Sequence, residues 1–285
     1  MHVGLRRAHE RRQSGPVAGP GCQRPGRHIG VGDAGGAVGH DLTVAGGPPA
    51  AERRHRRIRA TVAAVVDALV SWSGGKDAAT ALAAARASGV RVTGLLSTVA
   101  ERADGTGVEV PVHGVPLAVL AAQADALGVD LHPVVLPRGC PDPVYRERLG
   151  TALAGARDAG VTALVHGDVA LADVRAFRES VLEGTGVAGL FPLWGADTAA
   201  LARRIVDGGL RARVAAVDPA RVPAALAGRP FDDALLAALP AGTDPCGENG
   251  EFHTVVTDGP GFARPVPLAV TGTVTRDGHV QAVYG

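Results

Sequence analysis

Short apolar runs alternate with longer alanine- and leucine-rich stretches through the middle of the chain. The runs are rich in valine and leucine, and the stretches between them stop at or next to a glycine. This alternation predicts strands at 69–72, 91–97, 130–136 and 162–166, and helices at 77–89, 115–127 and 144–159. A repeated strand, helix, strand unit is right-handed, so we expect an α/β fold whose parallel sheet is sandwiched by helices.

The same rhythm continues after residue 170, with turns richer in proline. Further helices are predicted at 171–183, 197–207 (with Asp197 as N-cap) and 231–239, and further strands at 187–191, 212–217 and 253–257. The end of the chain, 271–284, alternates around Arg276-Asp277-Gly278 and predicts a β-hairpin. We therefore expect three parts: an extension at 1–61, a first α/β domain at 62–169 and a smaller α/β subdomain at 170–285.

Charge separates the extension from the rest of the chain. Residues 1–60 carry eleven arginines and four acidic side chains, a net charge of +7, whereas residues 61–285 carry 18 basic and 24 acidic groups, a net charge of −6. The extension also lacks aromatic residues, and we expect it to be disordered. Two interpretations stay open. One is an arm that binds nucleic acid, although it has no aromatic residues for stacking; the other is a non-native extension, with the true start near Val62 or Val66.

The remaining composition argues for a reducing compartment. No apolar run reaches the roughly 18 residues that span a membrane, and the amino end lacks the apolar core of a signal peptide. The three cysteines, Cys22, Cys140 and Cys246, are far apart and odd in number, so we expect no disulfide framework and no zinc or iron–sulfur site. A cytoplasmic location and no membrane partner are expected.

The first candidate site is Ser-Gly-Gly-Lys-Asp, residues 73–77, between the first predicted strand and helix. Two glycines, Gly74 and Gly75, let the backbone approach an anion, and the helix N-terminus points N–H groups at it. Ser73 adds a hydroxyl, and Lys76, the only lysine in the chain, adds a charge. The loop is not a Walker A motif, because Asp77 follows the lysine; that carboxylate suits magnesium. An ordinary strand-to-helix turn is the alternative.

The second candidate site is the polar run at 246–254. Glu248, Asn249, Glu251 and His253 lie within six residues, spaced by two glycines that allow tight folding. Carboxylates beside an imidazole suit magnesium binding, amine orientation or acid–base chemistry. A solvated turn that leads into the strand at 253–257 is the alternative interpretation.

Four blocks taken together resemble the bacterial branch of the diphthine-ammonia ligase family, within the pyrophosphate-loop ATP pyrophosphatases. The blocks are Ser73-Gly74-Gly75-Lys76-Asp77, His166-Gly167-Asp168-Val169, Phe191-Pro192-Leu193-Trp194-Gly195, and Cys246 to Thr254 followed by Asp258-Gly259-Pro260. Their order and spacing cover about Leu69 to Pro267. The resemblance implies a Rossmann-like, adenine nucleotide α-hydrolase-like fold, with 62–169 as the ATP-binding domain.

The resemblance also implies a reaction and a set of roles. A carboxylate on a small molecule or protein would be adenylated by Mg²⁺-ATP with release of pyrophosphate, and ammonia would then displace AMP. Lys76, Asp77, Glu248 and Glu251 would be catalytic. The nucleotide would be bound by Ser73, Gly74, Gly75, Lys76, Asp77, Ser97, Gly167 and Asp168, with Asp77 at the metal. His113, Asn249 and His253 would bind the substrate or ammonia.

Two departures from the family pattern leave other functions open. Ala78 stands where archaeal and eukaryotic relatives usually have serine, which removes one phosphate contact, and the block after Asp168 differs from the archaeal form. Together they put the acceptor in doubt. The alternatives are a sulfur-transfer enzyme of the same superfamily, with Cys246 as the one candidate relay, and an ATP-binding sensor without turnover. The sequence does not identify the acceptor, the ammonia source or the oligomeric state.

Overall fold

The computed structural model describes residues 65–102 and 105–285. The extension predicted at 1–61 lies outside the described residues. Within the described part, no helix combines the length and apolar character needed to cross a bilayer.

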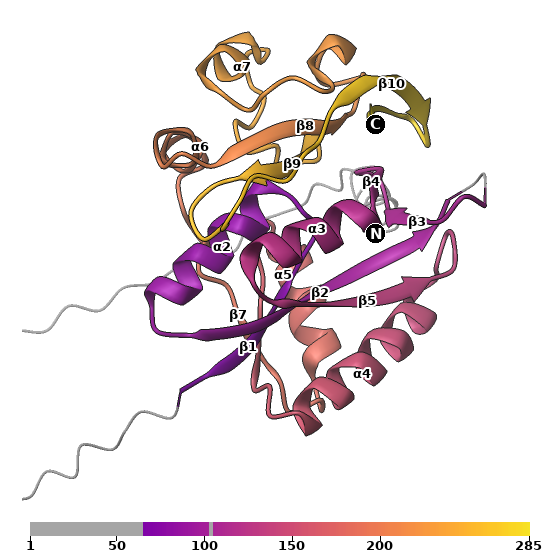
Figure 1. Ribbon diagram of the computed structural model, residues 1–285, viewed down its shortest axis with the longest axis vertical. Helices are drawn as coiled ribbons and strands as arrows, with labels where there is room; N and C mark the ends of the chain where they lie inside the picture. Colours follow the sequence, from indigo (N-terminus) through magenta and orange to yellow (C-terminus); the bar gives the residue numbers. More distant parts are fainter. Residues whose placement is uncertain (1–64, 103–104) are drawn as a thin grey trace, which may run out of the picture. The chain divides into compact units, whose positions relative to one another are not determined.

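A mostly parallel sheet forms the first layer (Figure 1). Its strands are β1 (Asp67–Ser71), β2 (Arg91–Glu101), β3 (Val108–Val110), β4 (Val115–Pro116), β5 (Asp130–Leu136), β6 (Ala163–Val165) and β7 (Ala188–Leu190). The parallel pairs give the order β5-β2-β1-β6-β7. The carboxyl end of β2 also pairs with β3, and β3 pairs with β4, both in antiparallel orientation. The order reverses at β1, so the carboxyl ends of β1 and β6 flank the position where ligands bind in such sheets.

Helices cover both faces of this sheet. They are α2 (Lys76–Ala87), α3 (Leu117–Leu127), α4 (Asp142–Asp158) and α5 (Ala172–Leu182). One core cluster joins α4 and α5 to one face, and the other joins α2 and α3 to the opposite face and to the second sheet. Figure 1 shows α2 and α3 between the two sheets. The predicted doubly wound α/β fold is confirmed.

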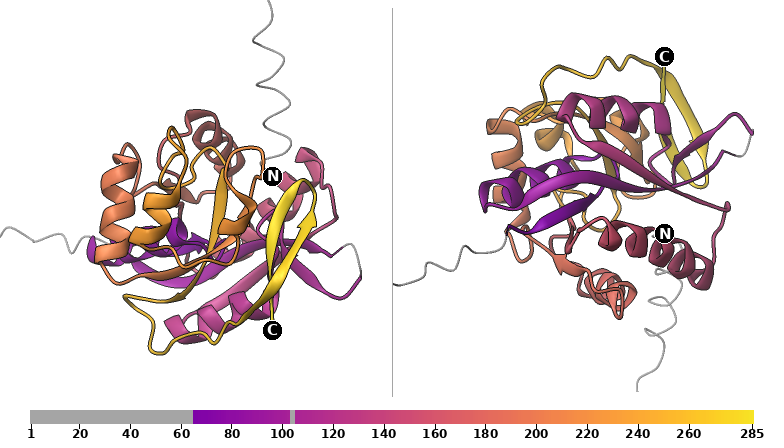
Figure 2. Two further views of the ribbon diagram at one scale, coloured as in Figure 1. Left: turned by 90° about the horizontal axis from the view of Figure 1, so that it is seen from above. Right: turned by 60° about the horizontal axis from the view of Figure 1, so that its bottom comes forward.

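A smaller antiparallel sheet follows, in the order β10-β11-β8-β9. It contains β8 (Arg211–Val217), β9 (Phe252–Asp258), β10 (Val270–Arg276) and β11 (His279–Tyr284), with α6 (Thr198–Asp207), a 3-10 turn (Ala224–Leu226) and α7 (Asp233–Ala238). Asp197 caps α6 as predicted, accepting from the Ala200 N–H at 2.7 Å. The predicted hairpin is β10–β11, yellow in Figure 2, which turns at Asp277 and Gly278.

Several predicted boundaries were wrong. The second strand continues from residue 97 to Glu101, so Ser97 lies inside β2 and not at its end. Val115 and Pro116 form β4, and the helix begins only at Leu117. The change from the first sheet to the second falls between Leu190 and Arg211, whereas the domain division predicted at residue 169 stays a prediction.

Candidate functional site

The glycines of the 73–77 loop are required by its geometry. Gly74 has a φ of 78°, in the left-handed region, and a Cβ there would lie 2.8 Å from Leu120 Cδ2. A Cβ on Gly75 would lie 3.1 Å from the Thr254 carbonyl oxygen of the second sheet. The loop therefore packs closely against both α3 and β9, and a side chain at either position would force its neighbours to shift.

The N-terminus of α2 presents unused backbone donors. Gly75 is the N-cap residue and has no side-chain cap, and the Lys76 N–H donates to Thr254 Oγ1 at 3.0 Å. Among the described residues, no acceptor pairs with the N–H groups of Gly75, Asp77 and Ala78. Free N–H groups at the positive end of a helix are suited to an anion such as a phosphate group.

Lys76 is buried and joins the loop to the second polar run. Its Nζ donates to both carboxylate oxygens of Asp77, at 2.8 and 3.0 Å, and to the Cys246 carbonyl oxygen at 2.5 Å. Burial is the largest single influence and lowers the pKa of the Lys76 ammonium, but the attraction of Asp77, Cys246 and Glu248 together holds the pKa above its usual value. The ammonium is charged and has three acceptors, so its predicted contact with phosphates requires an exchange of partners.

Glu248 reaches across to the loop after β6. Its carboxylate accepts from the Val169 N–H at 3.3 Å, while its own N–H donates to the Asp244 carboxylate at 3.4 Å. Burial, followed by the negative charge of Asp77, raises the pKa of Glu248 to about 7. The two predicted catalytic carboxylates, Asp77 and Glu248, are thus close enough to influence each other's ionisation.

Glu251 and Asn249 organise the turn that carries Glu248. Glu251 is 4% exposed, and its Oε1 accepts from Asn249 Nδ2 at 3.0 Å and from the Asp244 N–H at 3.4 Å. Its Oε2 has no hydrogen-bond partner among the described residues. A buried carboxylate oxygen without a donor is costly, which makes it a candidate to accept from a ligand.

Gly167 lets the loop after β6 approach the first turn of α2. A Cβ on Gly167 would lie 2.8 to 2.9 Å from the peptide group between Asp77 and Ala78. The neighbouring Asp168 turns the other way, with its Oδ2 3.5 Å from Arg178 Nε and 3.9 Å from His166 Nδ1. Gly167 therefore lies against the first turn of α2, while the Asp168 side chain faces α5, and their predicted part in nucleotide binding stays a prediction.

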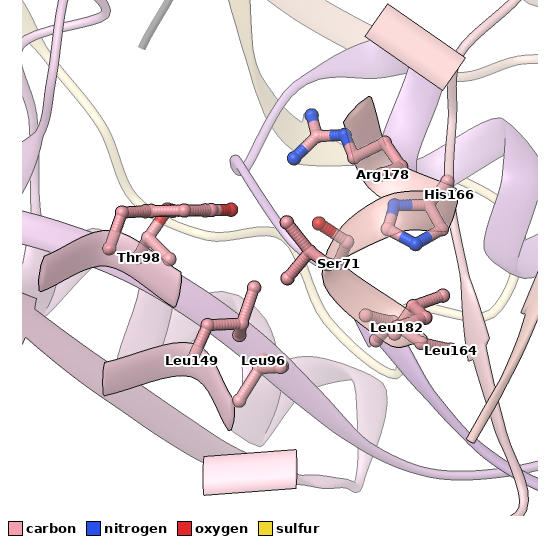
Figure 3. A pocket seen from close by; sticks show the side chains of 10 residues that line it. Ser71, Leu96, Thr98, Leu149, Leu164, His166, Arg178 and Leu182 are labelled. Carbon is pink, nitrogen blue, oxygen red and sulfur yellow. The ribbon is translucent and has the colours of Figure 1, made fainter. Parts of the chain in front are cut away.

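A small pocket lies beside these residues on the α4 and α5 face (Figure 3). Its polar groups come from Ser71, Thr98, Tyr145, His166 and Arg178, and the rest of its lining is leucine and valine. His166 stacks on Phe191 with ring centroids 5.0 Å apart, and burial lowers the pKa of its imidazole well below the usual value. With an interior of about 10 Å³, the pocket admits one water molecule and no larger ligand.

His113 and His253, the two histidines predicted to bind substrate, lie against each other. The rings of His113 and His253 stack with centroids 4.3 Å apart. His113 sits in a turn where Val112 has a φ of 69°, a strained conformation for a β-branched residue, and Gln281 Nε2 donates to the Val112 carbonyl at 3.0 Å. Their role in binding substrate stays a prediction.

Ser97 and Ser73 occupy different environments. Ser97 is fully buried, and its hydroxyl donates to the Trp72 carbonyl at 2.7 Å. This bond anchors the residue that precedes the 73–77 loop. Ser73 is half-buried at the loop itself. The predicted contact of Ser97 with adenosine stays a prediction.

Sequence reasoning missed Gln123 and the role of Thr254. Gln123 Oε1 accepts from Trp72 Nε1 at 2.8 Å, and its Nε2 donates to the carbonyls of Gly74 at 3.0 Å and Val256 at 2.7 Å. The available signal was a single amide in the largely apolar helix at 117–127, whose other polar residue is Asp125. Thr254 was noted as part of the second motif, but its bond to the α2 N-terminus depends on a contact 178 residues away in sequence.

The Cys246 thiol is part of the core. Cys246 is 2% exposed, and its Sγ donates to the Thr198 carbonyl at 3.3 Å. Burial raises the pKa of this thiol to about 12. Because a sulfur relay acts through the thiolate, Cys246 is poorly suited to that chemistry.

Metal-binding groups are sparse in residues 65–102 and 105–285. No cluster of three or more His, Cys, Asp or Glu side chains is arranged to hold a metal ion. Magnesium in phosphate sites commonly uses one or two carboxylates together with phosphate oxygens and water. Asp77, beside the free backbone donors of α2, fits that pattern.

Comparison with known proteins supports the superfamily. A family model described as the diphthamide synthase N-terminal domain matches residues 66–189. The match begins just before β1 and ends within β7, so it covers the parallel sheet and the 73–77 loop but not the 246–254 run. No curated protein matches the chain. The match supports an ATP-using protein of the pyrophosphate-loop type.

Proposed function

We propose that this protein is an AMP-forming amide ligase that adenylates a carboxylate with Mg²⁺-ATP and transfers ammonia to it. The supporting observation is that the 246–254 run is bonded directly to the phosphate-binding loop. Lys76 makes both bonds, through its ammonium to the Cys246 carbonyl and through its N–H to Thr254 Oγ1. Acidic groups suited to a second substrate thus lie beside donors suited to a nucleotide.

In the proposed first step, the N–H groups of Gly75, Asp77 and Ala78 bind the phosphates that leave as pyrophosphate. A carboxylate oxygen of the acceptor attacks the α-phosphorus, and the bond from that phosphorus to its bridging oxygen breaks. Backbone donors held in a fixed direction stabilise the charge that develops on the leaving group. Magnesium, held by Asp77, would neutralise phosphate charge when bound.

In the proposed second step, ammonia attacks the acyl carbon and the bond to the AMP oxygen breaks. The attacking nitrogen must lose one proton to leave a neutral amide. Glu248 is the candidate base, because a general base is most efficient when its pKa lies near the working pH, and the pKa of Glu248 is about 7. Glu251, with one unpaired carboxylate oxygen, is the candidate to orient the ammonia.

The sulfur-transfer alternative loses support, since its one candidate thiol is buried and protonated. The sensor alternative differs from the ligase in turnover, which a direct experiment measures.

The experiment incubates the full chain with ATP, magnesium, ¹⁵N-ammonium and a size-fractionated cell extract as the source of acceptors. The expected products are AMP, pyrophosphate and a new ¹⁵N-amide detected by mass spectrometry, in the small-molecule or the protein fraction. Glu251→Gln should bind ATP and form less amide. Release of ADP and phosphate, or ATP binding without AMP formation in any fraction, would refute the ligase assignment.

A further inference from the structure

Gln123 occupies an unusual position beneath the phosphate-binding loop. It is fully buried on α3, and its side-chain amide bonds to the Gly74 carbonyl of the loop, to the Val256 carbonyl of β9 and to the Trp72 indole. The Trp72 indole N–H can only donate, and the carbonyls of Gly74 and Val256 can only accept. The partners therefore fix the amide in one orientation, with Oε1 toward Trp72 and Nε2 toward the two carbonyls.

The Gly74 carbonyl receives a second hydrogen bond from the second sheet. The Val256 N–H donates to it at 2.8 Å, beside the bond from Gln123 Nε2 at 3.0 Å. Two donors from two different elements hold this oxygen, so the peptide group between Gly74 and Gly75 cannot rotate freely. Glycine needs such restraint, because it has the largest conformational freedom to lose.

Orientation of the carbonyl determines orientation of the next donor. A trans peptide is planar, so the Gly75 N–H points opposite to the Gly74 C=O. With the oxygen bound to α3 and β9, the Gly75 N–H points away from both, and no described residue accepts from it. It is one of the free donors at the N-terminus of α2.

We propose that Gln123 is a positioning residue that aims the Gly75 N–H at a phosphate group of the nucleotide. The inference needs only the nucleotide-binding part of the proposed function, and not the ligase reaction. Gln123 touches no substrate; it acts through the Gly74 peptide. Its partner Trp72 completes the arrangement by preventing rotation of the amide.

The test measures dissociation constants of the full chain for Mg²⁺-ATP, Mg²⁺-pyrophosphate and adenosine by titration calorimetry. Gln123→Met keeps the length of the side chain and removes its hydrogen bonds. We expect it to weaken ATP and pyrophosphate binding about tenfold, the effect of one well-placed hydrogen bond, with little change for adenosine. A merely structural role would weaken all three ligands together.

The chain offers a matched control in Gln281, the other buried glutamine of the described residues. Gln281→Met also deletes a buried amide, which bonds to Val112 and not to the loop, and should leave pyrophosphate binding unchanged. If Gln123→Met fails to fold, Trp72→Phe removes the bond that fixes the amide, together with part of the indole's packing, and should weaken pyrophosphate binding more than adenosine binding.

Three results would overturn the inference: unchanged pyrophosphate affinity in folded Gln123→Met, equal losses in the Gln123 and Gln281 variants, or no binding of pyrophosphate and ATP by the unmodified chain. ATP binding with no AMP formation would refute the ligase proposal alone and leave this inference standing.

Discussion

Replacing Glu248 by glutamine should stabilise the protein at alkaline pH. The pKa of Glu248 rises from 4.5 to about 7 in the folded protein, because burial and the charge of Asp77 disfavour the carboxylate. The folded state therefore keeps a proton that the unfolded chain has released between these pH values. The free energy of unfolding consequently falls as pH rises from about 4.5 to 7, and stays lower above that.

The size of the effect follows from the two pKa values. The difference between 4.5 and about 7 corresponds to about 3 kcal/mol. Since Glu248 is half-buried and water weakens the interaction, we expect about 2 kcal/mol to be measured. Glu248→Gln cannot ionise and can still accept from the Val169 N–H, so it removes this cost and retains the contact.

Urea unfolding of both proteins at pH 5 and pH 8 gives the comparison. Near-equal stability is expected at pH 5, where Glu248 is mostly protonated, and the variant should be the more stable protein at pH 8. Glu147→Gln, at an exposed position on α4, controls for loss of a carboxylate. A stability difference that is the same at both pH values would refute the reasoning, as would a variant that is less stable at pH 8.

Three other substitutions test the site. Lys76→Met should lower the free energy of unfolding by about 3 kcal/mol, because it leaves the Cys246 carbonyl and Asp77 without their donor; a loss under 1 kcal/mol in urea unfolding would contradict the bridging role. Gly167→Ala should displace the first turn of α2 and weaken pyrophosphate binding about tenfold in calorimetry, whereas Gly155→Ala, in open space on α4, should not. Cys246→Ala should retain AMP formation in the ¹⁵N assay, and its loss would revive the sulfur-transfer alternative.

The spacing of apolar residues, together with the glycines and prolines at the ends of elements, predicted most of the parallel sheet. The strand at 130–136 and the cap at Asp197 match the structure, because each depends on local sequence. The pairing of Val108–Val110 with β2 was missed, since so short a strand has no detectable period. Val115 and Pro116 were assigned to a helix for the same reason.

The sequence indicates which residues gather near the loop better than it indicates the hydrogen bonds between them. The Gly74-Gly75 pair and the Glu248 motif are visible in the sequence, and they do come together. The partners of Lys76, by contrast, are a neighbour in sequence and a carbonyl 170 residues away, and no local pattern encodes that distant bond. Gln123 was missed because a polar residue in a largely apolar helix does not reveal which distant groups it contacts.

The bond between Lys76 and Thr254 has a consequence for biosynthesis. The two partners are 178 residues apart, and ribosomes add about 5 to 20 residues per second. The glycine loop therefore leaves the exit tunnel roughly 10 to 40 seconds before the strand that fastens it. Until then the loop lacks its hydrogen bonds to Thr254 and Val256, so a chain that terminates before β9 is missing contacts that hold the Gly74 peptide and the first residue of α2.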